Sequence, residues 1–477
     1  MHTATRQRSL MIVAGLVGFA PPVAIAGGFA VQAQSTSQMG NAYAGVAASA
    51  LDASTIWWNP AGMSWIPGSG QPWGPRGQAV HAFNLMRTST QFTNENSSPA
   101  LGQPLGTEGG DAGTLRPTGA LYAQYRLNPE WHVGLGVNGP FGLRTVYDGE
   151  WMGRFQALKS QSQAHNINPS VAFKMSDHLS IGAGVSFQRF EAKLTNAVNY
   201  TGAVVAAALA TGAIAPAAVP ALVTPGAPGN IAGLQGSAEV SGDDWGVGWN
   251  LGFLYKPSNT FSIGAHYRSR IRYTLEGDVE FAAPGSASPL ATAFIAALGA
   301  PGGPLASGPV SANVTLPESF SVSSVVRIQP KVDLLLDATW FGWSTLSQIA
   351  FARESGAILN RLDFQWRDTW RLAAGATYHY SPGTQLRAGY AWDETVIDNE
   401  RTRNPRLPDS TKHWFSVGSR HALSDKTTLD LAANFVKAVT ARIPMRSDPS
   451  AAAAGVLDGR YRTNSFTLSA QVNHSFQ

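Results

Sequence analysis

Short segments in which apolar residues alternate with small or polar ones constrain the fold of this chain more than any other feature. In residues 179–189, leucine, isoleucine, alanine, valine and phenylalanine occupy every second position, with serine, glycine and glutamine between them. A strand with this pattern has one apolar and one polar face, and about ten residues cross a bilayer when the strand is tilted. The pattern recurs at residues 261–267, 372–380, 386–392 and 466–472. The alternation therefore predicts an all-β protein, an antiparallel transmembrane β-barrel.

The connections between the strands alternate in length. Six are tight polar turns, at residues 128–130, 176–178, 257–259, 329–331, 381–383 and 424–426. Seven longer connections lie between them, so thirteen connections join fourteen strands. An even number of strands places both chain ends on the short-turn side, which is periplasmic in bacterial barrels. A β-sandwich would also alternate, but it would not predict this regular succession of short and long connections.

The composition excludes several classes of function. Only 13% of the 477 residues are charged and the net charge is +4, which does not indicate a nucleic-acid partner. Cysteine is absent, which excludes disulfides, thiol nucleophiles and cysteine-ligated metals. The G-x-G-x-x-G pattern at residues 134–139 lies on an alternating strand and opens no helix. We expect no enzyme, metal or cofactor, although a barrel-borne hydrolase with a triad dispersed in sequence stays open.

The first 26 residues resemble a secretory signal peptide. Arg6 and Arg8 precede an apolar run at residues 10–20, and Ala24-Ile25-Ala26 has the form of a cleavage site. The mature chain would then begin at Gly27. A second apolar stretch, residues 203–223, is interrupted by two prolines and consists mostly of alanine, so we interpret it as a loop and not as a membrane helix.

Another apolar stretch, LDASTIWWNPAGMSWIPG at residues 51–68, does not favour a regular helix or a central strand, because Pro60 and Pro67 remove backbone donors and fix φ. Such an irregular apolar backbone is tolerated at membrane depth only where protein encloses it. A disordered periplasmic leader is the alternative, but paired tryptophans are unusual in disordered segments.

Several motifs resemble the long-chain fatty-acid outer-membrane transporter family (FadL/TodX-like), which includes channels for aromatic hydrocarbons. They occur in order along the chain: NPA at 59–61, GPFGLRTVYDGEWMGRF at 139–155, DDWGVGWNLG at 243–252, DTWRLAAG at 368–375 and LPDSTKHWFSVG at 407–418. The resemblance implies a 14-stranded barrel at residues 77–477 with an N-terminal plug, or hatch, at residues 27–76 inside its lumen. Asn59, Pro60 and Ala61 would form a rigid turn of that plug.

The resemblance also gives roles to two other regions. Residues 193–239 and 280–318 carry no charge between their end residues, and both belong to the long-loop side. Apolar loops that pack together and face outward are typical of a binding surface, and in the family the outer loops form a first landing groove. Gly139, Pro140, Phe141 and Gly142 should interrupt the third strand, and the family's kink there opens a gap for lateral exit. The alternative for the two loops is low-complexity sequence without a binding role. The alternative for Gly139–Gly142 is that the strand simply ends there at the outer rim.

Strand parity predicts a cationic lumen. Opposite the lipid-facing row of residues 261–267 lie His266, Arg268, Arg270 and Arg272, and the same step places further polar residues inside: Arg367, Arg371, Arg387, Lys412, Ser416 and Arg420. Arginine offers two parallel donors to a carboxylate, so Arg371, Lys412, Ser416 and Arg420 are candidate ligand-binding residues. Ion pairing with acids such as Asp393 and Asp430 is the alternative. Parity puts Asp368 on the lipid side near the outer rim.

These observations predict a monomeric outer-membrane barrel that takes up a hydrophobic ligand passively. A long-chain fatty acid would land on the outer loops, enter an apolar pocket around Phe29 and leave through the wall near Phe141 into the outer-membrane lipid. A channel for neutral aromatic hydrocarbons and a non-transporting adhesin or phage receptor are the alternatives. The chain ends with Phe476 on the lipid-facing row followed by Gln477, and we expect assembly to tolerate that extra residue.

Overall fold

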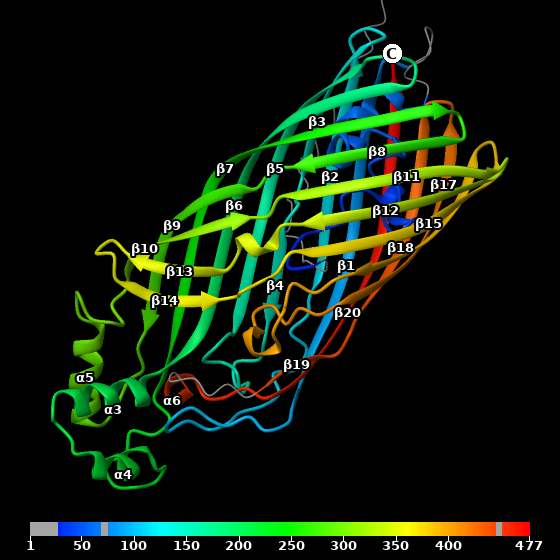
Figure 1. Cartoon of the computed structure of the whole chain (residues 1–477). Helices are drawn as coiled ribbons and strands as arrows, with labels where there is room; N and C mark the ends of the chain where they lie inside the picture. Colours follow the sequence, from blue (N-terminus) through cyan, green and yellow to red (C-terminus); the bar gives the residue numbers. More distant parts are fainter. Residues whose placement is uncertain (1–26, 68–74, 445–450) are drawn as a thin grey trace, which may run out of the picture.

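The fold is a closed antiparallel barrel, described by a computed structural model for residues 27–67, 75–444 and 451–477. Within these ranges twenty β-segments form one sheet, in which β1 pairs with β2 on one side and with β20 on the other. The signal-peptide prediction for residues 1–26 lies outside the described residues. Figure 1 shows the strands forming an inclined barrel, with the helices α3–α5 at one end and the C-terminus at the other.

The twenty segments make up fourteen strands. Eight strands are single segments: β1 (Gly77–Asn94), β2 (Leu115–Arg126), β5 (Lys159–Lys174), β6 (Leu179–Asn199), β7 (Gln235–Ser258), β16 (Thr384–Asp393), β17 (Lys412–Ser424) and β20 (Gly459–Phe476). Six are interrupted once: β3 (Trp131–Asn138) with β4 (Gly142–Val146), β8 (Phe261–Arg268) with β9 (Ile271–Ala282), β10 (Gly308–Leu316) with β11 (Ser319–Gln329), β12 (Val332–Phe341) with β13 (Gln348–Arg353), β14 (Ile358–Asp363) with β15 (Thr369–Ser381), and β18 (Thr427–Ala438) with β19 (Ala441–Ile443).

The helices are short and lie outside the ladder. The N-terminal segment contains α1 (Thr36–Met39), α2 (Thr55–Trp58) and η1 (Pro60–Trp65). The connections contain α3 (Tyr200–Ala210), η2 (Pro216–Ala218), α4 (Val219–Val223), α5 (Pro289–Gly299), η4 (Glu400–Thr402) and α6 (Ala451–Ala454), and η3 (Trp343–Thr345) lies in the interruption between β12 and β13. No helix in the described ranges combines the length and apolar character of a bilayer span. The stretch at 203–223 lies in the β6–β7 connection as expected, although α3 and α4 make part of it helical.

The fourteen-stranded count and all six tight turns are confirmed. One long connection differs from the prediction, because β13 and β14 are joined by only residues 354–357, where Gly356 adopts a φ of +83°. The residues predicted to form a long loop here lie instead in two irregular segments that interrupt the wall strands, residues 342–347 and 364–368. These interruptions direct Trp343 and Trp366 inward, where both side chains are buried.

The outer surface follows the predicted alternation. Along β20, Phe466, Leu468 and Val472 are exposed by between 43% and 51%, whereas the alternating residues Thr467, Ser469 and Gln471 are buried. An apolar row that remains open to the exterior in a folded chain is the surface that lipid covers. The opposite face of the same strand is polar, with Ser469 and Gln471 buried toward the lumen.

The predicted alternation of inward and outward side chains fails at two places, between β8 and β9 and before β15. The prediction that Arg270, Arg272 and Arg367 face the lumen is therefore wrong. Arg268 and the next residue, Ser269, are both buried, so the alternation shifts between β8 and β9 and leaves Arg270 and Arg272 exposed. A single extra residue reverses every side chain beyond it. Arg367 precedes the start of β15 and is half-exposed, paired with Glu394 at 3.1 Å. None of these three arginines lies in the lumen.

Residues 27–67, which we call the hatch segment, lie inside the barrel (Figure 1). They hydrogen-bond to inner faces around the circumference: Thr36 N to Gln471 Oε1 of β20 at 2.9 Å, Ala47 N to Ser323 Oγ of β11 at 3.0 Å, and Asn59 Nδ2 to Phe253 O of β7 at 2.9 Å. Non-helical backbone is tolerated here because protein satisfies its polar groups. The domain boundary at residue 76 stays a prediction.

Deletion of residues 27–67 should leave a folded barrel, since the wall strands hydrogen-bond to one another and not through this segment except at one place. We expect a heat-dependent shift on a gel, as for the full chain, together with increased leakage of small polar solutes through proteoliposomes. Leakage equal to that of the full chain would show that the segment does not obstruct the lumen.

Candidate ligand-binding site in the lumen

An aromatic cluster surrounds the start of the hatch segment. Phe29 is 6% exposed and its ring lies 5.2 Å from that of Trp343, 5.9 Å from Phe141, 6.0 Å from Trp366 and 6.2 Å from Phe190. The preceding residue must be glycine, because Gly28 has a φ of +64° and a Cβ there would lie 2.7 Å from the Trp343 ring. The prediction of an apolar pocket around Phe29 thus corresponds to a filled aromatic cluster, in which Phe29 occupies the centre.

Sequence reasoning missed the partners of Phe29. Trp343 and Trp366 lie in interruptions of β12–β13 and β14–β15, where the period-2 pattern gives no information on direction. The only available signal was a high density of aromatic residues in FGWST and FQWRDTW, residues 341–345 and 364–370.

The hatch segment begins beside a buried carboxylate. Gly27 N donates to Asp393 Oδ2 at 2.9 Å, and Asp393 is 0% exposed. Within the described part of the chain, Asp393 Oδ1 and Thr369 Oγ1 have no hydrogen-bond partner although both atoms are buried. Burying a carboxylate costs free energy unless hydrogen-bond donors surround it. The bond from Gly27 N reduces that cost, so Asp393 stabilises the position of the start of the hatch segment.

The predicted break in the third strand is confirmed. β3 ends at Asn138 and β4 begins at Gly142, and β2 pairs with β3 only as far as Leu121–Val137 and not with β4. The hatch segment supplies the missing backbone partners: Val31 N donates to Pro140 O at 2.8 Å and Gly142 N donates to Phe29 O at 3.0 Å. The wall ladder therefore has a gap at Gly139, Pro140 and Phe141 that the hatch segment covers from inside.

The NPA turn anchors the middle of the hatch segment. Asn59 caps η1 through its Oδ1, which accepts from Ala61 N at 3.1 Å, and its Nδ2 donates to Ala47 O at 2.6 Å. Pro60 occupies the first position of η1, where its missing N–H costs nothing. Two wall glycines permit the close approach, because a Cβ at Gly252 would lie 2.0 Å from Asn59 Oδ1 and one at Gly182 would lie 2.4 Å from Ala61 N.

Three of the predicted ligand-binding residues are already occupied by protein partners. Lys412 is ion-paired with Asp409, and Ser416 Oγ accepts from Asn434 Nδ2 at 2.6 Å. Arg420 binds Asp430 and, at 3.0 Å, Asp52 of the hatch segment. These side chains hold the protein together, which agrees with the ion-pairing alternative.

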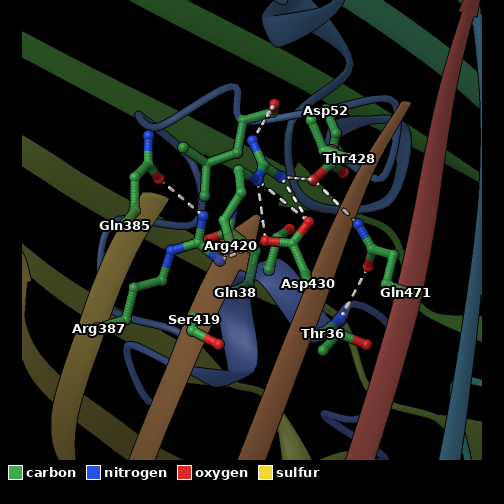
Figure 2. Close-up of polar contacts among 12 residues, drawn as sticks. Thr36, Gln38, Asp52, Gln385, Arg387, Ser419, Arg420, Thr428, Asp430 and Gln471 are labelled. Carbon is green, nitrogen blue, oxygen red and sulfur yellow. Dashed lines mark hydrogen bonds and ion pairs between the residues drawn. The ribbon is translucent and has the colours of Figure 1, made fainter. Parts of the chain in front are cut away.

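The pairs around Arg420 form a continuous network between wall and hatch, which Figure 2 shows in close-up. Arg387 donates to Asp430 Oδ1 at 2.6 Å, and Asp430 accepts from Arg420 at 2.8 Å. Gln471 Nε2 donates to Asp52 Oδ2 at 3.0 Å, so the carboxylate of Asp52 joins β17 to β20. We call Asp52, Arg387, Arg420 and Asp430 the charge latch. Its buried charges balance, two of each sign.

Among the buried arginines, Arg268 and Arg371 line a cavity of the lumen and have no carboxylate within ion-pair distance in the described part of the chain. Arg268 lies 3.6 Å over the Trp57 ring and donates to Trp57 O at 2.9 Å and to Ser186 Oγ at 3.1 Å. Arg371 is 1% exposed and donates to Ala42 O at 2.6 Å, while its Nε has no partner. The strand alternation predicted that both arginines face the lumen, and the structure confirms this. Only Arg371 had been predicted as a ligand-binding residue.

These two arginines line one cavity of about 50 Å³. Its wall is otherwise mostly aromatic and aliphatic, with Tyr43, Trp57, Trp58, Val46, Phe341 and Phe141. One acid is present, Asp337, whose oxygens accept from Ser323 at 2.6 Å and from Thr339 at 2.8 Å. The cavity extends to Pro140 and Phe141, so it meets the gap in the wall. A second cavity, of about 40 Å³, is lined by Gly28, Asp409, Ser410 and Lys412.

The long loops pack together at the end of the barrel opposite the C-terminus (Figure 1). Val204 and Val205 of α3 share a buried cluster with Ala291 and Leu298 of α5, and Ile231 completes it. Phe294, Leu222 and Val223 pack against this cluster and are only partly buried. The loops therefore expose apolar side chains at the mouth of the lumen.

Comparison with known proteins decides the family. Residues 18–476 match the family described as outer membrane protein transport protein (OMPP1/FadL/TodX). The chain belongs to this family. A long-chain fatty acid transport protein of Escherichia coli O6:H1 is 25% identical, with 86% of each chain covered. The crystal structure of a Pseudomonas aeruginosa FadL homologue superimposes with a TM-score of 0.80 at 24% identity, covering 95% of this chain and 100% of that one.

The Ralstonia pickettii toluene transporter TbuX has the same fold, with a TM-score of 0.59 at 17% identity over 92% of this chain and 97% of that one. Membership places the chain in the bacterial outer membrane as a transporter of hydrophobic small molecules. Fatty acids and aromatic hydrocarbons both fall within that description.

The charge latch yields a direct prediction. Asp52→Asn should leave Arg420 only partly compensated, and breaking one partner out of a buried ion pair costs about 3–5 kcal/mol. The hatch segment should therefore be held less firmly, and single-channel conductance should show frequent openings. Arg189→Gln, which removes an exposed pair with Asp243, is the matched control and should behave like the wild type. A closed channel in Asp52→Asn would contradict the latch.

Proposed function

We propose that this protein takes up long-chain fatty acids passively across the outer membrane. The observation that carries the proposal is Arg268, a buried guanidinium without a carboxylate, in an aromatic cavity beside the gap in the wall. Buried charges in proteins are normally paired, and an unpaired one is costly. A ligand with one carboxylate and an apolar tail would supply the missing charge and fill the apolar wall.

The charges of the cavity support a monoanionic ligand. Arg268 and Arg371 contribute two positive charges and Asp337 one negative charge, which leaves a net charge of +1. The other predicted inward cations are neutralised: Lys412 by Asp409, and Arg387 and Arg420 by Asp52 and Asp430. The head group should therefore bind at Arg268 and Arg371, and not at Lys412, Ser416 or Arg420 as the sequence alone favoured.

The cavity volume requires the hatch segment to move. Ligand pockets commonly enclose roughly 300–1,000 Å³, whereas this one holds about 50 Å³ because Ala30, Val31 and Tyr43 fill the space. Displacement of residues 29–31 would enlarge the cavity and break their hydrogen bonds with Pro140 and Gly142. Ligand entry and exposure of the gap in the wall would thus be coupled, and the ligand would leave laterally into lipid near Phe141.

The outer loops complete the route. The partly exposed apolar residues of α3 and α5 would capture the ligand first, and the aromatic cluster around Phe29 would receive it next. Binding energy moves the hatch segment, so no energy source or cofactor is needed.

A channel for neutral aromatic hydrocarbons is the second candidate, and similarity to the toluene transporters favours it on fold alone. A neutral ligand would leave Arg268 uncompensated, which is why we prefer the fatty acid. An adhesin or phage receptor would need neither the cavity nor the gap.

The head-group assignment is tested by Arg268→Met and Arg371→Met, each compared with the wild type for oleate and toluene binding. A hydrogen bond to a charged group is worth roughly 1.5–3 kcal/mol, so oleate affinity should fall by about one to two orders of magnitude, with toluene affinity nearly unchanged. Arg268→Lys keeps the charge and should retain part of the affinity. Equal losses for both ligands would reject the assignment, and a loss confined to Lys412→Ala would place the head group in the second cavity.

The exit route is tested by replacing Gly139-Pro140 with Val-Thr. The change restores a backbone donor and adds strand-favouring side chains, which should favour closure of the wall. Oleate should still bind to the purified barrel, whereas uptake of radiolabelled oleate by cells should be abolished. Wild-type uptake by a correctly inserted variant would indicate a path through the hatch into the periplasm instead.

A further inference from the structure

A group of cations faces outward where the barrel closes. Lys437 on β18, Arg442 on β19 and Arg460 and Arg462 on β20 are all exposed, and Glu95 is the acid that the described residues place among them. We call these four cations the seam patch. Glu95 pairs with Arg460 at 2.5 Å and with Arg442 at 3.5 Å. The patch therefore carries a net charge of +3.

Strand register brings these side chains together. Arg442 is directly opposite Arg460 in the β19–β20 ladder, and Lys437 is opposite Asn464, which makes Arg462 its diagonal neighbour. Diagonal neighbours on one face of a sheet lie roughly 7–8 Å apart, within reach of long side chains. Arg442 and Arg460, which are directly opposite, already share Glu95. The diagonal pair of Lys437 and Arg462 has no such acid in the described chain, so it favours an external anion that binds between them.

The height of the patch relative to the membrane identifies the anion. Lys437 follows the exposed Phe435 by two residues, about 7 Å along the strand, and Arg462 lies above Phe466 and Leu468 on the same outward row. Those apolar residues mark the lipid-covered belt. The patch is on the long-loop side of that belt, the side of the outer leaflet, at the level where lipid phosphates lie.

Cations at the same height on another part of the wall behave differently. On β6, Arg189 and Lys193 stand above Phe187 of the belt, and each has its own acid: Asp243 for Arg189, at 3.0 Å, and Glu239 for Lys193. Lys437 and Arg462 have no acid within 4 Å in the described part of the chain. The exposed cations of β6 are thus neutralised by protein acids, whereas Lys437 on β18 and Arg462 on β20 remain available to an external anion.

We infer that the seam patch binds the phosphate of a phosphorylated lipid of the outer leaflet, with Lys437 and Arg462 as its two free donors. Arginine and lysine are the side chains that proteins use for phosphate, and the guanidinium of Arg462 can donate two parallel hydrogen bonds to it. The acyl chains of the same lipid would pack on Phe435, Phe466 and Leu468. This inference concerns the outer surface and does not depend on the ligand of the lumen.

The test titrates the purified full chain in detergent with lipid A that carries its phosphates and follows bound lipid by native mass spectrometry. Each cation near an anionic lipid surface contributes about a fivefold gain in binding. Lys437→Gln with Arg462→Gln should therefore weaken binding roughly 30-fold. The control pair, Arg189→Gln with Lys193→Gln, should bind as the wild type does. A heat-dependent gel shift verifies that both double variants fold.

Two further arms distinguish the source of the phosphate. Dephosphorylated lipid A should bind the wild type as weakly as phosphorylated lipid A binds the seam variant, and millimolar inorganic phosphate should displace little bound lipid. Three outcomes would overturn the inference: unchanged binding in the seam variant, an equal loss in the control pair, or displacement by inorganic phosphate alone. None of the four substituted residues lines the cavity of Arg268 and Arg371, so oleate binding should stay at the wild-type value in both double variants.

Discussion

The closed ladder of backbone hydrogen bonds is the constraint on which the rest of this structure depends. Lipid offers no partner to a peptide group, so a sheet that crosses the membrane must have no free edge. β1 and β20 meet this requirement by pairing over their full length, from Gly77 with Phe476 to Asn94 with Gly459. Closure of the barrel also gives the sheet an inner face, where polar side chains such as Ser469 and Gln471 are buried away from lipid.

The same constraint explains the relation between the hatch segment and the third strand. Where β3 and β4 are interrupted, Pro140 O and Gly142 N would lack partners at membrane depth, and Val31 N and Phe29 O provide them. The hatch segment is therefore part of the wall at this place. In the proposed function, a ligand that displaces residues 29–31 removes those partners and exposes the gap, which links occupancy of the lumen to lateral release.

Buried charge organises the lumen in a comparable way. A charge removed from water must find a counter-charge or several donors. The charge latch does this with four residues, and Lys412 does it with Asp409. Arg268 relies on Trp57 O, Ser186 Oγ and the face of the Trp57 ring, none of which is anionic. In the proposed function, this uncompensated charge beside the cavity is what favours an anionic ligand.

The sequence alone determined the architecture, because alternation, tight turns and strand length are local properties. The fourteen strands, the six short turns and the break at Gly139–Gly142 could all be predicted from neighbouring residues. The motif order also predicted the family, which the match over residues 18–476 confirms.

Only the tertiary structure decided which inward cations are free. Lys412 and Arg420 looked equivalent to Arg268 in sequence. Asp409 and Asp430 are near these two cations in the chain, but the second acid of Arg420, Asp52, belongs to the hatch segment, 368 residues away, a separation that no local pattern reveals. The exposure of Arg270 and Arg272 depended on one irregular residue at Ser269, and the direction of Trp343 and Trp366 on interruptions of the wall. Periodicity fixes the face of a side chain only while the ladder is regular, whereas the partner of a buried charge depends on which distant strands closure of the barrel brings together.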